Sequence, residues 1–101
     1  MTDAVRNLTP GWIEGEIVFR GEHFRVLYES LSPSGRTAIF EVQEGHGPGS
    51  LGRISWYASW RCYGFFPNRG TVFEETCLSE LSVCCGRLTR QHRSRVRGRK
   101  P

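Results

Sequence analysis

A regular apolar stripe near the C-terminal end most constrains how this chain can fold. Its members recur at steps of four, four, three and four: Phe73, Cys77, Leu81, Cys84 and Leu88. This spacing puts them on one face of an α-helix, which must bury that face against another element. Leu78 and Cys85 widen the stripe. We therefore predict a helix over about residues 72–90, with a capping box from Thr71 to Glu74 at its start.

The chain before the stripe alternates apolar and polar residues, the pattern of half-buried β-strands. The alternation predicts strands over residues 13–20, 23–31 and 37–43. In the first of them, Ile17 and Phe19 are expected on one face and Val18 on the other. Gly21-Glu22 suits a type II′ hairpin turn, because glycine readily adopts the positive φ that this turn needs.

The segment 51–66 is the most aromatic part of the chain. We expect one central strand here, or two strands broken near Ala58-Ser59. Trp56, Trp60 and Phe66 share one parity and are expected in the core. Residues of the opposite parity form a candidate interface: Tyr57, Arg61, Tyr63 and Phe65. Exposed aromatic and arginine side chains can stack nucleic-acid bases, and they equally mark protein interfaces.

These elements together predict an α+β fold. We expect an antiparallel sheet of four to five strands, followed by one C-terminal helix packed on one face, with a basic tail. The chain of 101 residues is long enough for one domain with a single core. The expected organisation is an irregular segment at 1–11, the α+β domain at 12–90, and a flexible basic tail at 91–101.

Positive charge is concentrated at the C-terminal end. Seven of the fourteen basic residues lie in the last fifteen positions, which hold no acid: Arg87, Arg90, Arg93, Arg95, Arg97, Arg99 and Lys100. The rest of the chain has the other seven basic residues against all ten acids, a net charge of −3. Blocks of like charge are commonly solvated and bind anions, nucleic acid above all. These seven residues are the candidate nucleic-acid-binding set.

No pattern in the sequence predicts catalysis or a metal site. The four cysteines, Cys62, Cys77, Cys84 and Cys85, form no C-x₂-C pair, and we interpret them as thiols of the core. The three histidines have no metal-binding spacing, and there is no dinucleotide-binding motif, P-loop or nucleophile elbow. We expect no enzyme, no metal, no cofactor and no small-molecule substrate.

No apolar run is long enough to cross a bilayer, and the N-terminus has no apolar core of a secretory signal. We therefore expect a cytoplasmic protein without a membrane partner.

Two functions fit these features. The first is a small non-enzymatic binding module, associated with nucleic acid through its arginine-rich C-terminal tail. The alternative is a protein-interaction or inhibitor module, such as a phage or mobile-element protein that blocks a host protein in the manner of anti-defence and anti-CRISPR proteins. The acidic body and the surplus of aromatic residues favour this alternative.

Overall fold

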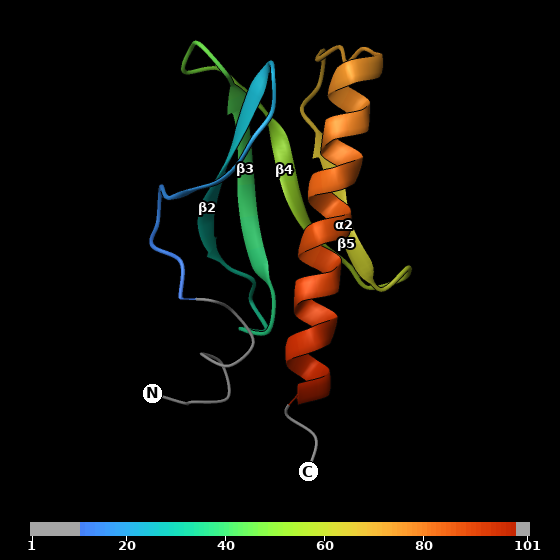
Figure 1. Cartoon of the computed structure of the whole chain (residues 1–101). Coiled ribbons are helices and arrows are strands. Elements are labelled where there is room, and N and C mark those ends of the chain that lie inside the picture. Colours follow the sequence, from blue (N-terminus) through green and yellow to red (C-terminus); the bar gives the residue numbers. More distant parts are fainter. Residues whose placement is uncertain (1–10, 99–101) are drawn as a thin grey trace.

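The computed structural model describes residues 11–98, and Figure 1 shows a twisted antiparallel sheet with a long helix beside it. The five strands are neighbours in chain order, β1-β2-β3-β4-β5. Their bounds are β1 Ile17–Arg20, β2 Phe24–Leu31, β3 Ala38–Glu44, β4 Ser50–Tyr57 and β5 Cys62–Pro67, and helix α2 spans Glu75–Gly98. The predicted α+β fold is confirmed, and the aromatic segment forms two strands. Most of the predicted irregular segment, together with Arg99 and Lys100, lies outside the described residues.

The core lies between α2 and one face of the sheet. Its fully buried side chains on the sheet come from the three middle strands: Phe24, Val26, Ala38, Phe40, Val42 and Ile54. From the predicted stripe, Leu81, Cys84 and Leu88 are buried against this face. Leu78 is exposed, because it borders a surface cavity beside β5 instead of the core.

The helix is capped by Glu74 and not by Thr71 as predicted. Glu74 Oε1 accepts a hydrogen bond from Cys77 N at 2.7 Å, and Glu74 O accepts one from Leu78 N at 2.9 Å. The bond from Cys77 lowers the pKa of the Glu74 carboxyl. Thr71 Oγ1 donates to Asn68 O at 2.7 Å instead. A carboxylate therefore satisfies a free N–H group of the first turn.

Strand β1 is shorter than predicted and carries a bulge. Its pairing with β2 shifts between Ile17 and Phe19. An extra residue at a bulge breaks the alternation of faces. Val18 and Phe19 therefore both pack against the core while Ile17 is exposed, and the predicted grouping of Ile17 with Phe19 is wrong.

The turn after β1 is not a type II′ turn, because Gly21 does not have a positive φ. The turn is instead fixed by the helix: both carboxylate oxygens of Glu80 accept hydrogen bonds from Glu22 N, at 2.9 and 3.0 Å. A Cβ at Gly21 would lie 2.7 Å from Glu80 Oε1. The same Cβ would lie 2.7 Å from Cε2 of the buried Phe24 ring, so glycine is needed here for the close approach of that ring and of the Glu80 carboxylate.

The turn between β4 and β5 reverses the parity of the core residues. Trp56 pairs with Tyr63, and Ile54 pairs with Phe65, so even residues of β4 share a face with odd residues of β5. Tyr63 is only 6% exposed, and its hydroxyl accepts a hydrogen bond from Ala38 N at 3.0 Å. Trp56 packs on the core as predicted. Trp60 and Phe66, predicted in the core, are exposed.

Helix α2 does not end near residue 90 but continues through Gly98. Figure 1 shows its last turns running past the strands. The rings of His92 and Trp56 lie 4.7 Å apart, and Arg93 Nη2 donates to Arg61 O at 2.8 Å. These contacts tie the helix end to the sheet. Residues 91–98, predicted as part of a flexible tail, are helical.

Replacing Leu81 with alanine is expected to lower the free energy of unfolding by about 2–5 kcal/mol, the range for truncation of a buried leucine. Leu81 is buried, whereas its neighbour Ser82 is exposed on the same helix turn. The control Ser82→Ala should change stability by less than about 0.5 kcal/mol. Urea unfolding measures both values, and equal effects would contradict the packing described for α2.

Candidate nucleic-acid interface

The candidate basic residues on α2 do not form one surface. Steps of three and four put Arg90, Arg93 and Arg97 on one side of the helix, which we name the basic helix face. Arg87 lies toward β1, where its guanidinium carbon is 5.2 Å from the centroid of the Phe19 ring. Arg95 is half-buried. Arg87 precedes Arg90 by three positions, so it is the direction of its guanidinium toward Phe19 that sets Arg87 apart from the basic helix face.

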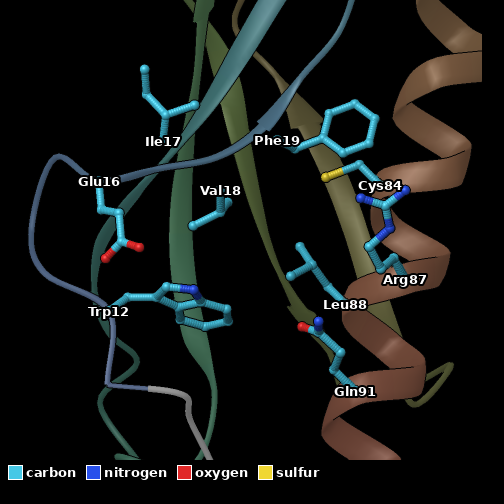
Figure 2. Close-up of a pocket in the computed structure, with 9 residues that line it drawn as sticks. All are labelled: Trp12, Glu16, Ile17, Val18, Phe19, Cys84, Arg87, Leu88 and Gln91. Carbon is cyan, nitrogen blue, oxygen red and sulfur yellow. The ribbon is translucent and has the colours of Figure 1, made fainter.

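Arg87 borders a cavity of about 230 Å³ between β1 and α2, shown in Figure 2. Trp12 and Leu88 contribute apolar walls, and Arg87 points from the helix toward Phe19. Glu16 Oε1 already accepts a hydrogen bond from Ile13 N at 3.0 Å. This cavity thus offers a ligand one guanidinium that is already stacked on a ring and one carboxylate that is already bonded.

The thiols near this cavity and along the helix are poor ligands and nucleophiles. Burial raises the pKa of Cys84 to about 12 and that of Cys85 to about 11. Both are therefore protonated at neutral pH, whereas the thiolate is the reactive and metal-binding form. Among residues 11–98, no group of three or more histidine, cysteine, aspartate or glutamate side chains is arranged to hold a metal ion.

The basic helix face adjoins an aromatic surface at the C-terminal end of α2. Trp56, His92, Arg93, Val96 and Arg97 border a cavity of about 320 Å³. Sequence analysis did not assign His92 or Val96 to a site. The steps of four from Leu88 to His92 and from His92 to Val96 are the signal that could have found them, since they continue the apolar stripe.

The turn between β4 and β5 is locked to this helix end. Arg61 has a φ of 55°, an unusual value for a residue other than glycine. Its N–H donates to Tyr57 O at 2.9 Å, and its carbonyl accepts the hydrogen bond from Arg93. The backbone of the turn is therefore held from both sides.

Aromatic side chains gather beside this turn on the sheet face that α2 does not cover. Trp60 is 76% exposed, Phe66 44% and Tyr57 39%. The ring centroid of Tyr57 lies 5.1 Å from that of Trp60 and 6.2 Å from that of Phe66. We name these three residues the aromatic groove.

Only two of the four residues predicted as an interface are exposed. Tyr57 and Arg61 are exposed, as that prediction requires. Tyr63 is buried, and Phe65 is half-buried with its ring 5.0 Å from Phe73. The predicted grouping is therefore wrong for these two, because the turn reverses the parity of β5 and directs them to the core.

His92 is set among aromatic and basic groups. Its Nδ1 is buried without a hydrogen-bond partner in the described part of the chain. Tyr63 of β5 and Trp56 of β4 face the ring, and Arg93 and Arg95 flank it on the helix. Burial first, and then these two arginines, lower the pKa of His92 below its ordinary value of 6.5.

The lowered pKa predicts how stability depends on pH. The unfolded state takes up the proton more readily, so the stability contributed by neutral His92 is present above about pH 6.5 and is lost as the pH falls below it. Wild-type protein should lose free energy of unfolding between pH 7.5 and 5.5. His92→Phe, which keeps a ring on Trp56, should lose less. Urea unfolding at the two pH values measures this, and equal losses would contradict it.

Comparison of the chain with known protein families, with curated proteins and with solved structures gives no match. Function must therefore be inferred from the residues and their geometry. Within residues 11–98, no helix has both the length and the apolar character needed to cross a membrane.

Proposed function

We propose that the protein is a small, non-enzymatic binding module that holds nucleic acid through the C-terminal turns of α2. The observation that carries this proposal is the basic helix face beside Trp56 and His92, fastened to the turn by the bond from Arg93 to Arg61 O. Residues 87–98 contain five arginines and no acid. A polyanion can therefore approach this end of the helix without being repelled by a negatively charged side chain of the same segment.

The chemistry of the face suits phosphate. Guanidinium groups donate in a planar fork that matches two phosphate oxygens. Each neutralised phosphate releases condensed counterions, which favours binding at low salt. Arginines on a helix also keep their spacing, so less backbone freedom is lost on binding than from a disordered tail.

The proposal is tested with a fluorescein-labelled oligonucleotide and the full chain, by anisotropy at about 50 mM salt, where phosphate contacts contribute most. Arg90→Gln with Arg97→Gln should weaken binding. The control, Arg20→Gln with Arg69→Gln, removes the same charge from exposed positions close to the other end of the helix. Its affinity for the oligonucleotide should stay closer to that of wild type. No binding by the wild-type chain would reject the proposal, and equal losses from both pairs would reject this location.

A protein partner is the second candidate function. The exposed rings of the aromatic groove favour it, because exposed tryptophan and tyrosine beside arginine are typical of protein interfaces. Under this alternative the chain binds no oligonucleotide at low salt.

We also propose that the protein acts in the cytoplasm. The four cysteines, all in the described part of the chain, are free thiols. Free thiols are usual in a reducing compartment, which supports this location.

A further inference from the structure

The aromatic groove is an exposed surface that folding alone does not explain. Trp60 leaves most of its large ring in water, although burial of such a ring is strongly stabilising. Gly64 lies beside Tyr57 and Phe66: a Cβ there would be 3.9 Å from Phe66 Cε1 and 4.0 Å from Tyr57 Cβ. Because glycine adds no side chain, the space between them stays open. Tyr57, Trp60, Gly64 and Phe66 border a cavity of about 490 Å³.

The residue that follows Trp60 is held in a backbone conformation that is unfavourable for a residue with a side chain. Arg61, the next residue, has the positive φ of 55° that costs free energy for a residue with a side chain. Contacts from Tyr57 O and from the Arg93 guanidinium hold it there. A left-handed residue is common at the end of a short β-hairpin loop, and here these two contacts fix the conformation of the loop that presents Trp60.

The charge of the residues near the aromatic groove indicates which kind of ligand the groove can bind. The bond from Arg93 joins the basic helix face to the residue that follows Trp60. The arginines lie on the helix side of the sheet and the rings on its open face, so a strand that contacts both must pass around the turn between β4 and β5. The middle of the open sheet face carries both signs of charge: Arg53 on β4 forms an ion pair with Glu29 on β2 at 2.9 Å and lies opposite Glu41 on β3, whereas the last turns of α2 carry only basic charge. The favourable region is therefore the end formed by the turn and the last turns of α2.

From this juxtaposition we propose that the ligand is single-stranded nucleic acid, with unpaired bases stacked on Trp60, Tyr57 and Phe66 and phosphates on the basic helix face. This inference rests on the proposed function and deepens it. Stacking on aromatic rings needs the flat face of a base, which a duplex keeps covered by its neighbours. Every base has such a face, so we expect little sequence preference.

The test compares a 15-nucleotide oligothymidine with a 15-base-pair duplex, using the full chain. Wild type should bind the single strand more tightly. Trp60→Ala should weaken binding to the single strand by about 5- to 150-fold, the range for loss of one stacked base, and should leave duplex binding unchanged. Trp60→Phe, which keeps an aromatic face, should recover most of the affinity.

The outcomes separate the two proposals. Equal affinity of wild type for both oligonucleotides, with no effect of Trp60→Ala, would overturn the single-strand inference and leave the proposed function standing. Binding of neither would overturn both. Thermal unfolding of Trp60→Ala should match wild type, because the ring is mostly exposed. A weakened single-strand affinity in a variant that unfolds like wild type supports the stacking role.

Discussion

Replacing Phe40 with alanine is expected to lower the free energy of unfolding by about 3–5 kcal/mol, the range for loss of a buried phenylalanine. Phe40 is fully buried on β3, the middle strand of the sheet. Its ring centroid lies 5.0 Å from that of Trp12, 5.9 Å from that of Tyr63 and 6.1 Å from that of Tyr28. These three rings come from separate segments, and each loses its contact with the Phe40 ring in the variant.

A matched control exists on the other face of the same sheet. Phe66→Ala deletes the same atoms from a ring that is already exposed. Its cost should be clearly smaller, because fewer contacts are lost and no closed cavity forms. Chemical unfolding of both variants measures the difference. If Phe66→Ala were the more destabilising, the assignment of the core to the helix side of the sheet would be wrong.

Removing the charge of the basic helix face should flatten the salt dependence of binding. Arg90, Arg93 and Arg97 replaced together by glutamine remove up to three phosphate contacts. Each contact contributes about 0.7 to the slope of log K against log salt on a single strand, so the slope should fall by up to about 2 units. Anisotropy titrations of oligothymidine between about 50 and 200 mM salt give this slope.

The charge-conserving variant is the control for this experiment. Lysine at the same three positions retains the positive charge but lacks the planar fork of N–H donors that a guanidinium presents. The slope of this lysine variant should stay near the wild-type value, even if affinity falls. A glutamine variant with an unchanged slope would show that these arginines do not contact phosphate.

The alternation of apolar residues predicted the sheet core where strands are regular. Phe24 and Val26 on β2, and Phe40 and Val42 on β3, are buried as a period of two requires. The same reasoning failed at β1, because a bulge shifts the register between Ile17 and Phe19. A bulge depends on how a strand meets its partner, which alternation within one segment does not reveal.

Parity failed a second time across the aromatic segment. One alternation carried through from Trp56 to Phe66 assigns Trp60 to the core, but antiparallel pairing after the turn exchanges the faces. Which residues of β5 face the core depends on the number of residues in the turn. Aromatic residues occur at both even and odd positions of this segment, so the sequence pattern did not determine that number. The exposed aromatic groove follows from this reversal.

The concentration of basic residues is a property of the sequence itself, but its setting on a helix was not predicted. Reading the stripe as ending at Leu88 left the following arginines on a tail. Since His92 and Val96 continue the stripe along the helix to Trp56, the arginines lie on a fixed helical face. A histidine packed on tryptophan is a weak apolar signal, so its part in the stripe was missed.

The most direct test of nucleic-acid binding at this end is an NMR titration of the ¹⁵N-labelled full chain with oligothymidine at low salt. We expect saturable shifts of amides in residues 57–62 and 90–98, at the turn and the last turns of α2. Amides in the middle of β2 and β3 should shift little. Shifts confined to the cavity between β1 and α2, or no shifts at any oligonucleotide concentration, would contradict the account.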